Sequence, residues 1–487
     1  MHIVLLALLI VPVVAAGLSV APYRIARVAT VVAGAASFVL AVCLVPTVAG
    51  HTIRFGFLRV DAISMVFLLA TSFVYATVAV YAIGYLRDEQ DEPHFDRYSR
   101  RFFLGFNVFA ASMLWAPAVD GLALLWIAIE ITTVVSALLV AIDRTDGATE
   151  ASWKYVLIAS AGLGIALLAT IFLYYAGASV LGQSYDLSFS PLLAAAGRLP
   201  DTAVRLSFVL AVLGFGTKVG LVPVHTWLPD AHAEAPTPVS ALLSGALLAT
   251  SFYAVLRYFQ VASAALGHTF PQMVLLVFGV ASLLLASLYL LQQRNIKRML
   301  AYSSIEHMGI LAIAVSFGAP LALAGAMLHV LAHAAAKGNA FMGAGTLVQK
   351  FGTKQISGIR GGMNVLPFSA PAFLLVILAL SALPPFGIFR SEFLIVAGGL
   401  RGGSHTMTAL LVVLVTLAFL GLAVGVTRMV VSPSPSGAAV ARGELNVWMV
   451  VPVAIGLVAL AVLGIHPPGE LSTLIDRAVA ELTRVGR

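Results

Sequence analysis

A single lysine, Lys218, stands within the apolar stretch LSFVLAVLGFGTKVGLVPVHTWLPD, where the nearest other formal charge is a dozen residues away. Holding a charged side chain at the centre of a membrane costs about 2.5 kcal/mol or more. Such a residue normally faces the protein interior or a water-filled path, where it can be paired or can release its proton. Lys218 is therefore the first candidate for moving charge across a membrane.

A carboxylate lies equally deep in a second apolar stretch, GLALLWIAIEITTVVSALLV, as Glu130. Without a partner it would be neutral there, because burial disfavours the charged form. Beside Lys218 both groups could stay charged, and the pair would then take up and release protons as a unit. A pump needs such a proton site whose affinity can be switched; a structural salt bridge between helices is the alternative.

Three further protonatable residues occur at steps of four in MLHVLAHAAAKGNAFMGAG, namely His329, His333 and Lys337. This spacing places them on one face of a helix, and histidine exchanges protons near neutral pH, which suits a proton relay. A helical HxxxH can also bind zinc. Because no cysteine or acidic ligand is near in the sequence, a packed histidine pair is the stronger alternative, and we expect no metal.

Prolines interrupt two of the apolar stretches near polar residues. Pro223 breaks one stretch after Lys218, and Pro384 and Pro385 break another, ALPPFGIFRSEFLIVAG. Broken helices at corresponding positions of two halves are typical of ion sites between inverted repeats. The polar residues beyond the breaks are His225, Asp230 and Glu392.

These residues have to be positioned by membrane helices. Apolar residues make up 60% of the 487 residues and charged residues only 10%, whereas soluble proteins carry about 25% charged residues. A span needs about 20 apolar residues, and the sequence predicts about fourteen. They cover 2–20, 26–48, 61–86, 102–118, 121–142, 153–177, 203–223, 236–260, 270–292, 299–317, 320–347, 369–400, 406–430 and 445–466.

The predicted fold is an all-α integral membrane protein with two inverted five-helix repeats and broken seventh and twelfth helices. We divide the chain into a three-helix segment (1–101), the first repeat (102–265), the second repeat (266–430), and a C-terminal helix with a tail (431–487). Basic residues outside the spans are more frequent in the odd-numbered loops, which places those loops in the cytoplasm and the N-terminus outside. Only Lys218, Lys337 and Arg390 are expected inside spans.

Composition also excludes several functions. The net charge of +7 would suggest nucleic acid in a soluble protein, but here the basic residues lie in short loops, so it reports membrane orientation. Cys43 is the only cysteine, which excludes an internal disulfide and a thiolate-ligated iron–sulfur cluster within this chain. The glycine-rich string GFGTKVG fits neither nucleotide-binding pattern.

The string KVGLVPVHTWLPDAHAEAPTPVSALLSG (Lys218–Gly245) resembles the antiporter-like subunits shared by respiratory complex I, Mrp-type sodium/proton antiporters and membrane-bound hydrogenases. The strings FNVFAASML, EASWKYVLIASAGLGIALL and AYSSIEHMGI are similar to the hydrogenase-4 component F subgroup. The last string contains Glu306 and His307, and two interpretations stay open for this pair: part of that subgroup's proton path, or a salt bridge at a loop edge.

The resemblance implies a hydrated polar axis along the membrane midplane. By this match Glu130 corresponds to the fifth-helix glutamate and Lys218 to the pumping lysine of the seventh helix. His329, His333 and Lys337 correspond to the eleventh-helix relay, and Glu392 to the acidic residue of the twelfth helix. In one departure, Ala249 stands where complex I members often carry an eighth-helix lysine, so water or a nearby histidine has to bridge the two halves.

We therefore expect a proton-translocating subunit of a complex I-like hydrogenase or formate-oxidising assembly in the plasma (inner) membrane. The resemblance implies no redox cofactor in this chain, with nickel–iron and iron–sulfur centres in a peripheral partner arm and other membrane-arm subunits alongside. The alternatives are a subunit of a cation/proton (Mrp-type) antiporter or of complex I itself, a non-conducting scaffold, and a membrane partner in inorganic-carbon uptake. Nucleic acid is not expected as a partner.

Overall fold

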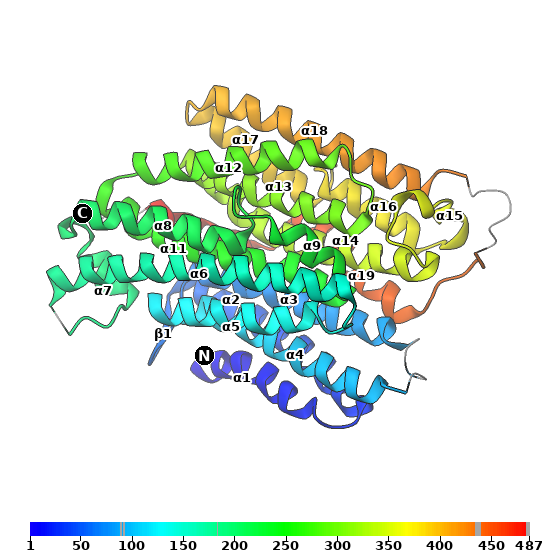
Figure 1. The fold of residues 1–487 in the computed structure, drawn as a ribbon. Coiled ribbons are helices and arrows are strands. Elements are labelled where there is room, and N and C mark those ends of the chain that lie inside the picture. The colour runs from blue at the N-terminus through cyan, green and yellow to red at the C-terminus, as the bar shows by residue number, and fades with distance from the viewer. Residues whose placement is uncertain (88–89, 91–92, 183, 434–439, 484–487) are drawn as a thin grey trace.

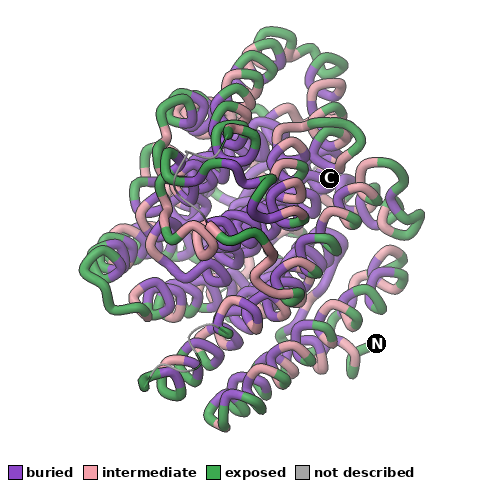
Figure 2. The backbone as a smooth tube through the Cα atoms, turned by 90° about the vertical axis from the view of Figure 1, so that its right-hand side faces the viewer, coloured by how far each residue is buried: buried purple, intermediate pink, exposed green. Residues whose placement is uncertain are grey.

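Long apolar helices run side by side through most of the molecule (Figure 1). The structure is a computed structural model, and it describes residues 1–487 apart from 88–89, 91–92, 183, 434–439 and 484–487. Part of the last predicted segment, 431–487, therefore lies outside the described residues. Figure 2 shows that buried residues fill the middle of the bundle, whereas many exposed ones lie on its rim.

The first segment holds four helices and a short antiparallel hairpin, and the remaining elements follow in three groups. The first segment consists of α1 His2–Leu18, α2 Tyr23–Gly50, β1 Ile53–Phe55, β2 Leu58–Val60, α3 Ala62–Tyr85 and α4 Phe95–Trp115. The first half comprises η2 Ala116–Ala118, α5 Leu122–Val140, α6 Asp146–Leu181, α7 Phe189–Ala194, η3 Ala196–Arg198, α8 Asp201–Val219, α9 Trp227–Glu234, α10 Thr237–Leu242, η4 Leu243–Leu247 and α11 Leu248–Leu266.

The second half comprises α12 Thr269–Leu290, α13 Ile296–Phe317, α14 Pro320–Phe351, η5 Ile356–Gly358, α15 Gly362–Val365, α16 Ser369–Leu380, α17 Gly387–Arg401 and α18 His405–Val430. The chain continues with α19 Val447–Ile465 and α20 Gly469–Thr483.

Among the described residues, eleven helices are long and apolar enough to cross a membrane. They are α2, α3, α5, α6, α8, the continuous α10–α11 helix, α12, α13, α14, α18 and α19. Helices α1 and α16 are apolar but shorter, and α4 begins with a charged turn, FDRYSRR. The all-helical membrane fold is therefore confirmed, while the count of fourteen spans stays a prediction.

Exposed apolar faces on the outer helices match a lipid environment. On α12, Met273, Val277 and Leu288 are exposed, while Gly279 and Leu283 on the opposite face are buried against α13. Helix α13 differs, because the whole of its apolar stretch is buried. A helix that is buried on all sides can carry polar residues that a lipid-facing helix cannot.

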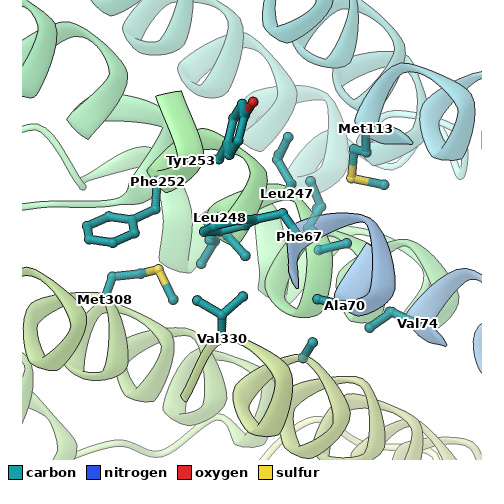
Figure 3. Packing of buried hydrophobic residues seen from close by; sticks show 14 of the residues in the cluster. Phe67, Ala70, Val74, Met113, Leu247, Leu248, Phe252, Tyr253, Met308 and Val330 are labelled. Atoms are coloured by element: carbon teal, nitrogen blue, oxygen red, sulfur yellow. The ribbon is translucent and has the colours of Figure 1, made fainter. Parts of the chain in front are cut away.

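The centre of the bundle is close-packed and apolar. Phe67 on α3, Leu248 and Phe252 on α11, Met308 on α13 and Val330 on α14 lie together there (Figure 3). These side chains join α3 of the first segment to both predicted halves. Any polar connection between the halves has to run beside this layer rather than through it.

Two interruptions of the helices fall where the prolines predicted them. After α8 the chain turns at Gly220, whose positive φ of 84° suits glycine, and Pro223 follows a cis peptide bond. The freed backbone groups find partners, because Trp227 Nε1 donates to the Thr217 carbonyl at 2.7 Å and the Val222 amide donates to Ser282 Oγ at 2.9 Å. Such partners are what a broken membrane helix requires.

The second interruption separates α16 from α17 and also holds a cis peptide bond, Pro384–Pro385. Helix α17 then begins at Gly387, where a Cβ would lie 2.9 Å from Leu463 Cβ and 3.1 Å from Ala332 Cβ. Because glycine has no Cβ, the start of α17 can pack directly against α14 and α19. Glu392 follows on the second turn of α17, facing the helices that carry the histidines.

A buried ion-pair network joins the end of the chain to its beginning. Arg257 Nη2 lies 2.6 Å from Asp61 Oδ1, and Arg59 Nη2 lies 2.9 Å from Asp61 Oδ2. Glu481 on α20 accepts from the amides of Ala62 and Ile63 at 3.3 and 3.2 Å, at the positive end of the α3 dipole. Burial alone would raise the pKa of Asp61, but the two arginines hold that pKa well below its usual range.

Two expectations fail here. Arg257 stands near the end of the predicted span 236–260 and was counted with the loop residues, yet it is 3% exposed, since Asp61 supplies a counter-charge inside the protein. The segment after α19 was expected as a tail, yet it forms α20, which packs on α2, α3 and α14. Its apolar residues recur at helical spacing and are buried; they are Leu474, Ile475, Ala478, Val479 and Leu482.

We predict that Arg257→Met lowers the free energy of unfolding by about 3 kcal/mol, because it leaves Asp61 buried with half of its counter-charge. Thermal unfolding of the purified chain in detergent measures this loss. The control is Arg198→Met at an exposed position, which should change stability by less than about 0.5 kcal/mol. Equal effects of both substitutions would contradict the role of the network.

The wild-type network should also respond to acid. Because the pKa of Asp61 is lowered on folding, its contribution is fully present above the ordinary aspartate pKa of about 3.9 and is lost only as the pH falls below it.

Candidate functional site

Lys218 lies at the end of α8, is completely buried and faces the protein rather than lipid. Its ammonium donates a hydrogen bond to Tyr155 Oη on α6. It also lies 4.6 Å from the centre of the Tyr155 ring and 5.8 Å from that of Trp227. The aromatic rings partly replace the solvation that burial removes from the cation.

Tyr155 links Lys218 to α5. Its hydroxyl lies 2.7 Å from Ser136 Oγ on that helix, and its ring lies 4.3 Å from the ring of Trp227. Glu130 is on the same helix as Ser136 and interacts electrostatically with Lys218, but the two do not form a direct ion pair. The predicted pairing of Glu130 with Lys218 is therefore a pairing at longer range.

Glu130 is only half-buried, and its Oε2 atom is enclosed without a hydrogen-bond partner among the described residues. Its neighbours on α5, Ile127, Ile131 and Val134, are exposed. Glu130 thus stands at the edge of the first half, between the buried lysine and the outer surface of α5.

Small residues hold α6 and α8 together closely enough for these contacts. A Cβ on Gly214 of α8 would lie 2.4 Å from the Ala166 amide nitrogen of α6 and 2.7 Å from the Gly162 carbonyl. The helix backbones therefore touch at this point, as is common where membrane helices pack through small residues. This contact sets the distance between Tyr155 and Lys218.

The second polar group surrounds three histidines from α13 and α14. His307 Nδ1 lies 3.1 Å from His329 Nε2, and His329 Nδ1 lies 2.9 Å from Ser391 Oγ on α17. The His333 ring lies 5.3 Å from the His307 ring, and all three histidines are completely buried. The predicted helical face of His329, His333 and Lys337 is thus buried in the protein.

The hydrogen bonds show which nitrogen or oxygen atom carries each proton between His307, His329 and Ser391. Ser391 has one hydroxyl proton and donates it to the Ile388 carbonyl at 2.8 Å, so His329 Nδ1 has to donate to Ser391. His329 Nε2 is then the acceptor, and His307 Nδ1 carries the proton between the two rings. His307 Nε2 remains able to accept a proton, as a relay requires.

Lys337 continues this face of α14 and donates to the Leu300 carbonyl at 3.0 Å. It interacts electrostatically with Glu306 on α13, and Glu306 in turn interacts with Glu392. The Glu306–His307 pair is therefore part of the buried group and is not at a loop edge. Among the described residues, Glu306 Oε2 and both ring nitrogens of His333 are buried without hydrogen-bond partners, and such atoms usually bind ordered water.

One combination of side chains in this group has the geometry of a metal site. Ligand atoms of His307, His329 and Glu392 all lie within 4.8 Å of one another. The argument that no acidic ligand lies near the histidines is therefore wrong, because α17 brings Glu392 to them. Imidazole and carboxylate are suitable zinc ligands, but here the two histidines already satisfy each other through a shared proton.

His232 on α9 lies between the two groups, and we did not single it out from the sequence. It is completely buried, and its Nδ1 donates to the Leu228 carbonyl at 2.9 Å, which leaves Nε2 as an unpartnered acceptor. Its ring lies 6.3 Å from that of Trp227 and 5.4 Å from that of Phe341, and it interacts electrostatically with Lys337.

Two other predicted residues lie away from the main groups. His225 is buried in the turn between α8 and α9, and its Nδ1 has no hydrogen-bond partner among the described residues. Asp230 on α9 instead forms ion pairs with Arg298 at 2.8 Å and Lys154 at 3.3 Å near the surface. Ala249 is buried beside the apolar centre, and the next hydroxyls, those of Thr250 and Ser251, bond to carbonyls of their own helix.

Two family models match parts of this chain. Residues 119–420 match the family model described as "NADH:quinone oxidoreductase/Mrp antiporter, TM", and residues 46–103 match "NADH-Ubiquinone oxidoreductase (complex I), chain 5 N-terminus". The chain belongs to the NADH:quinone oxidoreductase/Mrp antiporter family.

Two relatives of this antiporter-family chain show which subgroups it is similar to. It is 36% identical to a hydrogenase-4 component F homolog of Methylacidiphilum infernorum, over 74% of this chain and 76% of the relative. It is 30% identical to NADH-quinone oxidoreductase subunit N of Desulforudis audaxviator, over 87% of this chain and 84% of the relative. The resemblance inferred from the motifs is therefore confirmed.

Solved structures show that the fold of this antiporter-family chain is shared. A chain of the archaeal membrane-bound sulfane sulfur reductase superposes with a TM-score of 0.85 at 22% identity, covering 99% of this chain and 98% of that one. A chain of the Mrp complex from Dietzia sp. DQ12-45-1b superposes with a TM-score of 0.84 at 20% identity, with the same coverage. At these identities the likeness establishes the fold.

We predict that Tyr155→Phe lowers proton flux about tenfold or more, because it removes the hydroxyl that joins Lys218 to Ser136, and such a bond to a charged group contributes about 1.5–3 kcal/mol. Flux is measured with the full-length chain in liposomes, driven by a potassium diffusion potential and read by an internal pH dye. The phenylalanine ring can still stack on Trp227. Tyr174→Phe, at a 38% exposed position of the same helix, should leave flux unchanged; equal flux in both variants would rule out this role of Tyr155.

Proposed function

We propose that this chain is a proton-translocating membrane subunit of a complex I-like hydrogenase or formate-oxidising complex. The observation that carries the proposal is the complete burial of two lysines, Lys218 and Lys337, each within a group of polar side chains. Intramembrane ionisable residues are costly to retain and usually mark ion pathways. The similarity to a hydrogenase-4 component F homolog supports the choice of complex.

Lys218 would take up a proton when Glu130 favours its charged form and release it when that influence weakens. Tyr155 and Ser136 connect the lysine to α5 through hydroxyl groups that can both donate and accept. Moving one charge against 100 mV costs about 2.3 kcal/mol. A change of this size is within reach of one lysine–carboxylate interaction in a low-dielectric interior.

His232 would connect the halves in place of the lysine that Ala249 replaces. Its free Nε2 can accept a proton, and it lies between Trp227 of the first group and α14 of the second. The proton would then reach Lys337 and move through Glu306 and the histidine chain towards Glu392. Water would have to bridge the longer gaps, as it commonly does between buried polar groups.

In this proposal the two predicted repeats, 102–265 and 266–430, each supply one lysine. The redox centres would reside in a peripheral partner arm, and other membrane-arm subunits would lie beside this chain in the plasma membrane, with its N-terminus outside. The ion pairs of Asp230 with Lys154 and Arg298 would then face the cytoplasm, in agreement with the excess of basic residues in that set of loops.

We predict that Lys218→Arg and Lys337→Arg each abolish voltage-driven proton flux, since a guanidinium keeps the charge but does not release its proton in proteins. The full-length chain in liposomes with an internal pH dye provides the measurement. Lys350→Arg, at the partly exposed end of α14, is the matched control and should conduct like the wild type.

Retention of wild-type flux in both variants would remove the transport role and favour a scaffold. Flux in the wild type that requires a sodium gradient would instead favour a sodium/proton antiporter. Proton flux that is independent of sodium, together with loss in both arginine variants, supports the proposal.

A further inference from the structure

A polar cavity opens between α6, α9 and α13, and its lining residues are distinct from those of the two buried groups. It has a volume of about 450 Å³, and its wall includes Glu150, Lys154, Asp230, Glu234 and Arg298. Its charges hold one another in place, since Asp230 pairs with Lys154 and with Arg298. A cavity lined by charges of both signs is hydrated and can exchange protons with bulk water.

Lys297 is next to this cavity but does not line it. It is adjacent to Arg298 at the start of α13, is 3% exposed, and its ammonium donates to the Ala235 carbonyl at 2.8 Å. Ala235 follows Glu234, which lines the cavity and pairs with Lys354 at 2.9 Å. The sequence had suggested a loop position for Lys297; α9 covers it and places it inside the protein.

Among the described residues no carboxylate contacts the Lys297 ammonium directly. Its interactions with Glu234 and Asp143 are electrostatic and act over a longer distance, and Lys354 opposes them. A purely structural lysine at this depth would be expected to form a direct ion pair, because an unpaired buried charge is costly. A lysine that alternates between ammonium and amine does not need a permanent partner.

His232 is on α9, three residues before Ala235, whose carbonyl accepts the Lys297 hydrogen bond. It interacts electrostatically with both Lys297 and Lys337. Its free Nε2 can accept a proton. Cavity, lysine and histidine thus follow one another from the surface to the second buried group.

We propose that this cavity is the mouth through which protons enter the second half, and that Lys297 carries them from the cavity to His232. This inference rests on the proposed function. A neutral Lys297 amine takes one proton from cavity water, and the ammonium passes one proton to Nε2 of neutral His232. The imidazolium then gives one proton to the Lys337 amine, so that Lys297 and His232 are again neutral and Lys337 holds the proton as an ammonium.

The test compares Lys297→Arg and Lys297→Gln in the full-length chain in liposomes, with Lys350→Arg and Lys350→Gln as matched controls. Both Lys297 variants should lower voltage-driven proton flux at least tenfold, and both controls should keep it. If Lys297 served only as a structural positive charge, arginine could take its place. Wild-type flux in Lys297→Arg would therefore overturn the carrier role. If Lys218→Arg and Lys337→Arg also conduct normally, the proposed function fails; if they are inactive while Lys297→Arg conducts, only this inference fails.

A second measurement does not alter Lys297. Gly147 is exposed and lines the cavity, and the exposed Cys43 is the only native cysteine. In a Cys43→Ser background, Gly147→Cys should react with a membrane-impermeant cationic thiol reagent from the side that carries Lys154, and the modification should reduce proton flux at least fivefold. Modification without any change in flux would show that the cavity is not the mouth.

Discussion

The cost of holding charge in a low-dielectric interior is the constraint on which this structure depends. Lys218, Lys337 and Arg257 are all buried at depth, yet the protein treats them differently. Arg257 has a direct carboxylate partner in Asp61 at 2.6 Å and belongs to a closed network. The two lysines instead bond to a hydroxyl and a carbonyl, with their acidic partners farther away. Direct pairing suits a structural role, and indirect pairing leaves a proton free to move.

The two halves meet this constraint with different chemistry. In the first half, aromatic rings and two hydroxyl groups surround the lysine, and the acidic residue stands at the edge of the bundle. In the second half, three histidines and two carboxylates gather on α13, α14 and α17. The apolar centre in Figure 3 is formed where α3, α11, α13 and α14 meet. His232 lies between the two groups on α9, a short helix that follows the chain break after Gly220.

The sequence predicted the isolated charges and the helix breaks, because a lysine in an apolar run and a proline in a helix are local signals. It did not predict the contact of Glu392 with His307, which joins positions 85 residues apart along the chain. Lys297 was missed because hydropathy near the end of a span cannot distinguish a solvated loop from a position covered by another helix. Tyr155 and His232 were missed for a similar reason, since their roles depend on which helix face meets Lys218 or Lys337.

The central claim is that a hydrated path of protonatable side chains joins the two buried lysines. A cryo-electron microscopy map of the intact complex, at a resolution that shows ordered water, tests it most directly. The account predicts water density that links Tyr155 and Lys218 to His232, and His232 to Lys337. Side chains packed without water between these residues, or either lysine turned towards lipid, would contradict it.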